Sequence, residues 1–306
     1  MLRLVARGST PVRSGVLPTT KVPARNAGAG LRDLRVRIKS VNSIQKITAS
    51  MKLVAAAKLK AAQENVEQSL PSMNTFLPLT QLTEAKTEPQ NVKNVAVIPI
   101  FADRGLCGSI NSGIGRAVTR VLKAEMPNLE NADFYVFGEK GRSLLARDYI
   151  RSFQVALVGF DKKKYIAFED VLDVVDLISA GNYDQYTLFY NHFVNMITFR
   201  IQTKNFPPKG KLVEADWSEY EIEGDKDAVL SDLYDYYIAT SIYGALVDNA
   251  AAELSARMSS MENASKNAGA MIQNLTIKFN KGRQASITTE LIEIISGAES
   301  FRVEAD

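Results

Sequence analysis

The stretch Leu233–Phe279 decides the fold, and it reads LYDYYIATSIYGALVDNAAAELSARMSSMENASKNAGAMIQNLTIKF. From Leu233 onward, apolar or small residues recur in steps of four and three that alternate without a break, and no proline interrupts them. This spacing is typical of a helix that packs against another helix along a heptad seam. The seam residues with large side chains are Leu233, Tyr237, Val247, Leu254, Met258, Met261, Ile272, Leu275 and Phe279.

The pattern continues beyond both ends of this stretch and predicts one helix over residues 225–300, followed by a short acidic tail at 301–306. Helices in globular proteins average about 11–12 residues. A helix several times longer cannot bury its apolar stripe against one compact domain. We therefore expect a second long helix, a surrounding partner, or both.

A second helical pattern covers residues 31–70, and Pro71 and Pro78 predict its end. Its outer face carries eight cations between Arg32 and Lys60 against the single acid Asp33. That excess indicates an acidic partner surface, although nucleic acid or anionic lipid would fit the charge equally well. The apolar residues recur at close to the α-helical period and are Leu34, Ile38, Val41, Ile44, Ile47, Met51, Val54, Leu59, Ala62, Val66 and Leu70.

Between the two helical patterns, residues 71–91 are polar with three prolines and predict a linker, and residues 92–224 predict an α/β domain. Alternating strands and helices favour βαβ units and a mainly parallel sheet. We predict an α/β fold: a long antiparallel coiled coil of the N- and C-terminal helices plus a Rossmann-like domain. The expected strands are 92–101, 134–137, 153–158, 186–190 and 196–201, with a further edge strand at 217–222, and the expected helices are 111–123, 139–147 and 168–179.

The composition limits the chemistry. One cysteine and one histidine allow no intrachain disulfide and come close to excluding a structural zinc site. No run approaches the roughly 20 apolar residues of a membrane span. The net charge of +3 comes from residues 1–30, because the rest of the chain has 32 basic and 34 acidic residues. The charge is therefore no argument for nucleic-acid binding.

Residues 1–30 are rich in arginine, serine, threonine, glycine and proline and contain no acid. This composition is typical of a mitochondrial transit peptide, and a disordered N-terminal arm is the alternative. If the segment is a transit peptide, we expect cleavage between Arg25 and Leu31.

The loop Asp103-Arg104-Gly105-Leu106-Cys107-Gly108-Ser109 follows the first expected strand, a position where α/β sheets bind phosphates. It lacks the lysine of a P-loop and is not a GxGxxG motif, so we interpret its glycines as turn residues. Arg104 could lower the pKa of Cys107, but a lone cysteine is more commonly a small buried hydrophobic residue.

Other candidates for chemistry are weak. His192 has no ligand set near it in sequence and is assigned no role. Glu290 and Glu293 share a helix face, which we interpret as solvated or as a contact for a basic partner. We therefore predict no catalytic residue, no metal site and no cofactor.

Four stretches, in order, resemble the gamma subunits of F-type ATP synthases in their mitochondrial form. The resemblance covers about residues 31–300. Its motifs are Ile38-Lys39-Ser40-Val41 with Gln45–Lys58, Asp103–Ser109, Met261–Ala268 and Ile287–Ser300.

This resemblance implies a non-catalytic rotor shaft in the central stalk, which couples proton-driven rotation of a membrane c-ring to nucleotide-state changes in a ring of alpha and beta subunits. It also implies that the α/β domain, with its turn at Asp103, Arg104, Gly105, Cys107 and Gly108, is a foot. That foot would contact the small rotor subunits delta and epsilon and the c-ring, on the matrix side of the mitochondrial inner membrane. The implied head contacts are Lys46, Met51, Lys52, Lys58, Lys60, Arg283, Gln284 and Glu290.

Two other functions remain open at this point. A nucleotide-binding α/β enzyme with coiled-coil arms would bind ATP or a dinucleotide with roughly micromolar affinity, about 8 kcal/mol of binding free energy. A coiled-coil scaffold of the mitochondrial matrix would purify without ATP synthase subunits.

Overall fold

The computed structural model describes residues 25–74, 92–126, 129–160, 166–181, 183–213, 217–218 and 220–303. The chain divides into two compact units. Unit 1 combines the chain up to Ser43 with the chain from Gly269 onward, and unit 2 is Ile44–Ala268. Two long helices contribute to both units: α1 (Arg25–Asn74) and α7 (Lys226–Val303).

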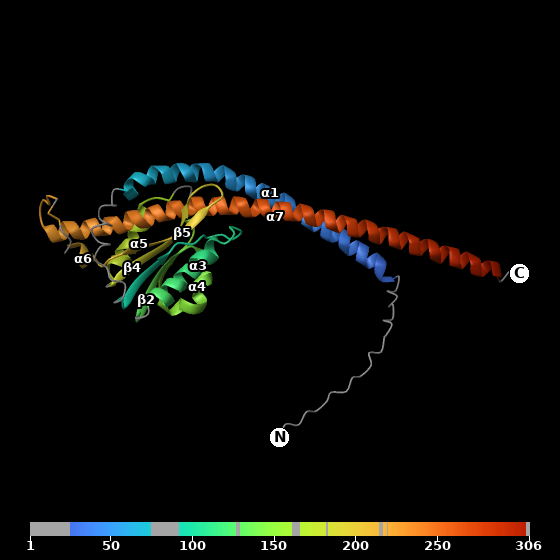
Figure 1. Cartoon of the computed structure of the whole chain (residues 1–306), viewed down its shortest axis with the longest axis horizontal. Coiled ribbons are helices and arrows are strands. Elements are labelled where there is room, and N and C mark those ends of the chain that lie inside the picture. The colour runs from blue at the N-terminus through green and yellow to red at the C-terminus, as the bar shows by residue number, and fades with distance from the viewer. Residues whose placement is uncertain are drawn as a thin grey trace, which may run out of the picture. The chain divides into compact units, whose positions relative to one another are not determined.

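Unit 2 contains a five-stranded sheet in the order β3-β2-β1-β4-β5 (Figure 1). Strands β1 (Asn94–Pro99), β2 (Asn131–Phe137), β3 (Phe153–Leu157) and β4 (Gln185–Phe193) are parallel. Strand β5 (Phe199–Phe206) pairs antiparallel with β4 at one edge. The prediction of a mainly parallel sheet is confirmed.

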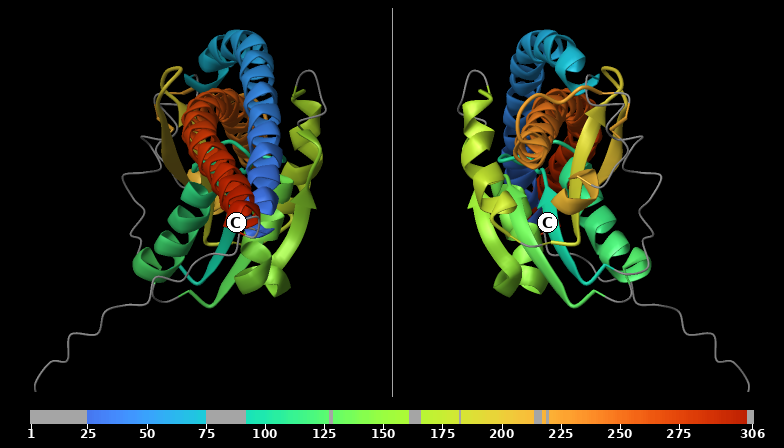
Figure 2. Two further views of the ribbon diagram at one scale, coloured as in Figure 1. Left: turned by 90° about the vertical axis from the view of Figure 1, so that its right-hand side faces the viewer. Right: turned by 90° about the vertical axis from the view of Figure 1, so that its left-hand side faces the viewer.

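Strand β1 is central, and its apolar run from Val95 to Ile98 is fully buried because helices cover both faces of the sheet. One face packs against α3 (Ile110–Arg120) and α4 (Glu139–Tyr149). The other packs against α5 (Glu169–Ser179) and the first part of α7, so α5 and the α3–α4 pair lie on opposite sides (Figure 2). Shorter elements are the π-helical turn η2 (Val121–Glu125), the 3-10 turn η3 (Ile150–Ser152) and α6 (Lys209–Val213).

In unit 1, α1 and α7 pack antiparallel. The side chain of Leu31 on α1 lies 3.1 Å from the position that a Cβ at Gly282 on α7 would take, so the glycine allows the two helices to approach closely. One turn along, the Arg35 guanidinium lies 5.6 Å from the centre of the Phe279 ring, within the range of a cation–π contact. The residue numbers rise on α1 as they fall on α7, which is the antiparallel arrangement.

In unit 2, α1 and α7 are joined by an ion pair in which the Lys52 ammonium lies 3.1 Å from the Glu262 carboxylate. With the sheet, the paired long helices confirm the fold class predicted from the sequence. None of the nine large seam residues of α7 is exposed; all are buried or half-buried.

Helix α1 differs from its prediction. It passes through Pro71 and ends at Asn74, because a proline removes one hydrogen bond without preventing a last turn. The predicted inner stripe is confirmed in part: seven of its eleven residues are buried or half-buried and four are exposed, while small residues outside it are also buried. The buried residues outside the stripe are Thr48, Ala55 and Ser69, the fully buried stripe residue is Leu59, and the exposed stripe residues are Ile44, Ile47, Val54 and Leu70.

The expected edge strand at 217–222 was wrong for the residues described there, which form turns and irregular backbone. Trp217 instead packs into the core, and its indole N–H donates a 2.8 Å hydrogen bond to the carbonyl of Leu212. Elsewhere in the described chain, no helix has a segment both long and apolar enough to cross a membrane.

Candidate functional site

Asp103 lies at the carboxyl end of β1 and joins three strand ends. Its Oδ1 accepts a 3.1 Å hydrogen bond from the backbone N–H of Glu139, and its Oδ2 accepts a 3.0 Å bond from that of Gly159. Gly138, at the N-cap of α4, has a φ of 93° and no side chain to cap the helix. Asp103 therefore supplies the missing cap from a residue far away in sequence.

The rest of this loop packs on α7. The Arg257 guanidinium lies 3.5 Å from the carbonyl oxygen of Gly105 and forms an ion pair with Glu253 on its own helix. Gly108 has a φ of 65°, and a Cβ there would stand 2.9 Å from the Ser260 hydroxyl. The interpretation of this glycine as a turn residue is confirmed, and the second reason for it is the close approach of α7.

Cys107 is buried against the small residues Ala252 and Ala256 of α7. Burial raises the pKa of its thiol, and the charge of Glu253 adds to this. The interpretation of Cys107 as a small buried hydrophobic residue is therefore confirmed, and the alternative of a pKa lowered by Arg104 is wrong, because loss of solvent outweighs the effect of a nearby cation. The protonated thiol acts as a small apolar side chain, not a nucleophile.

A second link joins the end of β4 to α7, and sequence reasoning missed it. The buried carboxylate of Asp248 lies 2.6 Å from Nδ1 of His192 and accepts a 2.7 Å hydrogen bond from the backbone N–H of Phe193. Beside it, Asn191 donates a 2.8 Å hydrogen bond to Asn249. Burial raises the pKa of Asp248 despite these two hydrogen-bond partners. The sequence did contain one sign of this link. Asp248 and Asn249 are two polar residues next to the apolar seam of α7, and polar groups buried there need hydrogen-bond partners.

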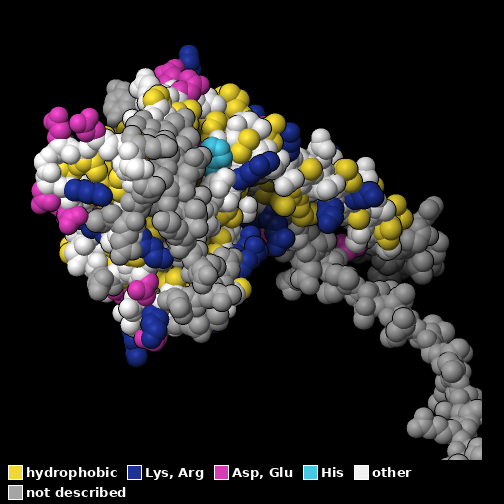
Figure 3. Space-filling view, turned by 60° about the vertical axis from the view of Figure 1, so that its left-hand side comes forward, with side chains coloured by type: hydrophobic (Ala, Val, Ile, Leu, Met, Phe, Trp, Pro, Cys, Tyr) yellow, Lys and Arg dark blue, Asp and Glu magenta, His cyan; other side chains and the backbone are white. Residues whose placement is uncertain are grey.

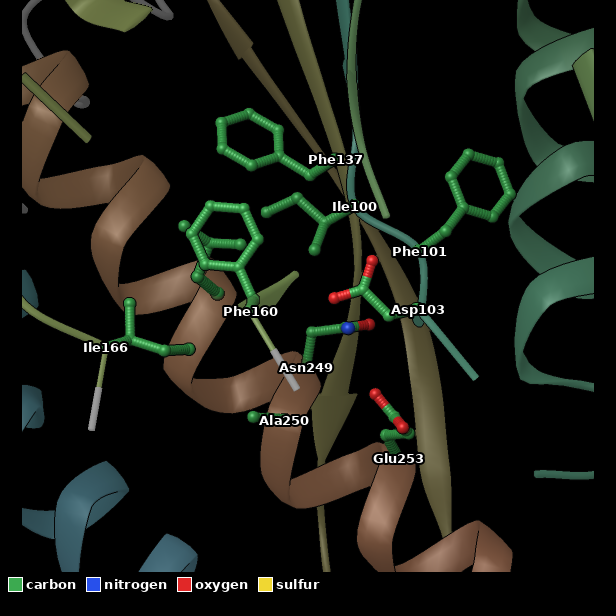
Figure 4. Close-up of a pocket in the computed structure, with 10 residues that line it drawn as sticks. Ile100, Phe101, Asp103, Phe137, Phe160, Ile166, Asn249, Ala250 and Glu253 are labelled. Atoms are coloured by element: carbon green, nitrogen blue, oxygen red, sulfur yellow. The ribbon is translucent and has the colours of Figure 1, made fainter. Parts of the chain in front are cut away.

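A cavity of about 60 Å³ lies between the carboxyl edge of the sheet and α7, and Asp103 and Asn249 are among the residues that line it. Figure 4 shows Asn249 and Glu253 on the helix, near the strand end that carries Asp103. Small-molecule sites usually measure about 300–1,000 Å³. Open α/β sheets bind ligands where the strand order reverses, here between β1 and β4, and at the end of β4 the side chains of Asp248 and Asn249 from α7 occupy the hydrogen-bonding groups. The arrangement is a mechanical joint between sheet and helix.

The predicted head-contact residues are divided between the two units. In unit 2, Lys46, Lys58 and Lys60 are exposed and Met51 is half-buried. Lys52 differs because its ammonium is paired with Glu262. Lys266 and then Lys52 donate hydrogen bonds to that carboxylate and lower its pKa.

In unit 1, Arg283, Gln284 and Glu290 are all exposed on the last third of α7. Glu290 accepts a 3.1 Å hydrogen bond from the hydroxyl of Ser286, one turn earlier. In the described part of the chain, no three His, Cys, Asp or Glu side chains are grouped so that they could hold a metal ion.

Comparison with known proteins identifies the family. Residues 30–301 match the protein family described as ATP synthase. The ATP synthase gamma chain of Roseobacter denitrificans is 37% identical over 290 residues, which cover 89% of this chain and 99% of the relative. A chain of the mitochondrial ATP synthase central stalk and c-ring of Tetrahymena thermophila is 30% identical, with a TM-score of 0.60 over 72% of this chain and 99% of that one.

The fold also matches a chain of the Euglena gracilis mitochondrial ATP synthase, with a TM-score of 0.73 over 91% of this chain and 97% of that one. At 21% identity this likeness concerns the fold alone. The family match covers nearly the whole chain. The paired long helices and the mainly parallel sheet are the architecture that the resemblance to this family implied. The chain therefore belongs to the ATP synthase gamma-chain family, the non-catalytic rotor subunits of the central stalk.

Proposed function

We propose that this chain is the rotor shaft of a mitochondrial ATP synthase, with its helix pair inside a ring of alpha and beta subunits. The observation that carries this proposal is the apolar end of α7 in unit 1. Five large aliphatic side chains are 46–67% exposed there within nine residues. An apolar stretch of this kind favours enclosure by a partner. Its residues are Ile287, Leu291, Ile292, Ile294 and Ile295.

The shaft acts by binding the nucleotide states of the ring unequally. A contact of equal strength in every state would shift no equilibrium. Each 1.4 kcal/mol of difference changes nucleotide affinity about tenfold. Rotation of the c-ring, driven by protons, would turn the helix pair, and its unlike faces would then favour a different state in each catalytic subunit in turn.

The foot, in this proposal, binds the small rotor subunits delta and epsilon and the c-ring, which places the chain at the matrix face of the mitochondrial inner membrane. Support for the mitochondrial location comes from residues 1–30, which are acid-free and arginine-rich. The family match begins only at residue 30. Residues 1–24 lie outside the described part, and α1 begins at Arg25. N-terminal sequencing should find a start between Arg25 and Leu31, and a retained Met1 would contradict the transit peptide.

Purification through a tag on this chain tests the complex. From mitochondria, we expect alpha and beta subunits to be recovered with it together with ATPase activity. Recovery of the chain without these subunits would exclude the rotor function and favour a scaffold.

Replacing Arg283 and Gln284 together by alanine is expected to lower ATP synthesis about tenfold or more in the assembled complex. Hydrogen bonds to charged groups contribute about 1.5–3 kcal/mol, and both side chains are exposed and available to the head. Lys278→Ala, an exposed position on the same helix, is the matched control. Equal synthesis rates in the double variant and the control would remove the assigned contact.

Replacing Lys46, Lys58 and Lys60 by glutamine is expected to weaken coupling between proton flow and ATP synthesis several-fold, and more strongly at low salt, because exposed charges are screened. Lys52→Gln should have a smaller effect on the partner contact, since Glu262 already pairs with that ammonium. Proton-driven ATP synthesis in vesicles measures both. Unaltered coupling in the triple variant would rule out an acidic partner at this surface.

A further inference from the structure

Helix α5 has a second, outward face that the fold does not use. Its inward residues Val171, Val174, Val175 and Ile178 complete the packing against the sheet. On the outside, Leu172 and Leu177 remain 41% and 51% exposed. Three exposed acids lie beside these leucines at helical spacing. The outer face of α5 is thus Glu169, Leu172, Asp173, Asp176 and Leu177.

The stability of helix α5 explains only some of the residues on its outer face. Acids in the first turn, such as Glu169, are favourable beside the positive end of the helix dipole. Asp176 stands in the last turn, where the dipole disfavours a negative charge. Neither the Asp173 carboxylate nor the Asp176 carboxylate has a hydrogen-bond or ion-pair partner among the described residues. The described part of unit 2 therefore leaves these two carboxylates unpaired beside two exposed leucines.

The same character continues onto the neighbouring helix. The Phe168 ring, just before α5, lies 5.8 Å from the ring of Tyr236 on α7. Tyr236 is 52% exposed, and Asp232, one turn earlier on α7, is also exposed. Figure 3 shows acidic and hydrophobic side chains exposed on the same face of the molecule, with lysine or arginine side chains among them. The surface therefore spans two helices.

The opposite side of the sheet is less acidic, and α4 there carries three bases and two acids. Helix α3 carries Arg116 and Arg120 and no acid, whereas α5 carries four acids and no base. The acidic character therefore belongs to one face of unit 2, where it would select a partner by sign of charge.

We propose that the outer face of α5, with Tyr236 and Asp232, is the docking surface for a cationic amphipathic helix of another subunit of the complex. Apolar side chains of that helix would cover Leu172 and Leu177, and its lysines or arginines would pair with Asp173 and Asp176. This is helix-on-helix recognition, with apolar contacts for affinity and charges for orientation. The inference rests on the proposed function for the existence of neighbouring subunits and adds where one of them binds.

Zero-length cross-linking of the purified complex tests this surface. A water-soluble carbodiimide joins a carboxylate to a lysine amine as an amide only when the two groups are in direct contact. We expect peptides that link Asp173 or Asp176 to a lysine of another subunit, in a helical segment with apolar residues three or four positions away. No link to another subunit, or a link to a second copy of this chain, would overturn the proposal.

Two variants and a control sharpen the result. Leu172→Ser with Leu177→Ser should lower the yield of the link about tenfold, because the apolar contact that holds the partner is lost. Asp173→Asn with Asp176→Asn should abolish it. The control is Leu144→Ser with Asp148→Asn on α4, an equally exposed leucine and acid on the other side of the sheet. An unchanged yield in the leucine variant would contradict an apolar contact.

The two proposals can fail separately. If alpha and beta subunits are absent from the purified material while the link to a lysine-bearing helix is found, the docking surface holds and the rotor function fails. If the alpha and beta subunits are present and the carboxylates of α5 form no link, the rotor function holds and the docking surface fails.

Discussion

Replacing Gly138 by alanine is expected to destabilise the α/β domain by about 3 kcal/mol or more. The φ of 93° at this residue is a conformation that side chains disfavour. A Cβ there would also stand 2.4 Å from the carbonyl oxygen of Phe101, and a backbone atom in a buried strand end cannot move aside cheaply. The measurement is urea unfolding followed by the fluorescence of Trp217, the single and buried tryptophan.

The matched control is Gly115→Ala in α3. A Cβ at Gly115 would meet no atom within 4 Å, and its φ is not positive. Alanine there should therefore stabilise the helix by about 0.5–1 kcal/mol. If both variants unfolded at the urea concentration of the parent chain, the packing of Gly138 against the end of β1 would be wrong.

Replacing Asp103 by alanine is expected to destabilise the same domain by about 2–4 kcal/mol. The change removes the acceptor of two backbone N–H groups, those of Glu139 and Gly159. A buried donor without a partner costs about 1–3 kcal/mol. The same urea titration measures the loss, since the core around Trp217 includes strands that Asp103 helps to join.

Asp103→Asn and Asp148→Ala serve as comparisons. Asparagine keeps one oxygen acceptor, so it should retain part of the stability. Asp148 is exposed on α4, and its removal should change stability by no more than about 0.5 kcal/mol. If Asp148→Ala lowered the free energy of unfolding as much as Asp103→Ala, the hydrogen bonds of Asp103 would not explain the loss of stability.

Periodicity predicted the elements well wherever one stripe or strand had to be buried. The heptad steps from Leu233 to Phe279 predicted α7, and the run from Val95 to Ile98 predicted the central strand. On α1 it was right only in part, because Ile44, Ile47 and Val54 are exposed while smaller residues such as Thr48 and Ala55 are buried. Which positions of α1 are buried depends on where α7 packs against it, and small side chains can fill those positions.

The joint between sheet and helix was harder to predict because its partners are distant in sequence. Asp103 caps a helix 36 residues away, and Asp248 meets His192 across 56 residues. No local pattern encodes such pairs. The glycines Gly105 and Gly108 in the sequence indicated a turn at this position. Their contacts with Arg257 and Ser260 of α7 are seen only in the folded chain.

The amino-acid order alone specifies two long helices around a mainly parallel α/β domain, because hydrophobic period and proline placement act over neighbouring residues. The opening stretch from Leu233 to Phe279 also shows that its helix needs a long partner. Only the tertiary structure shows that α7 packs against the carboxyl edge of the sheet and that the outer face of α5 is exposed. Those outcomes depend on which buried polar groups and glycines meet across the fold, and such contacts form only when distant segments pack together.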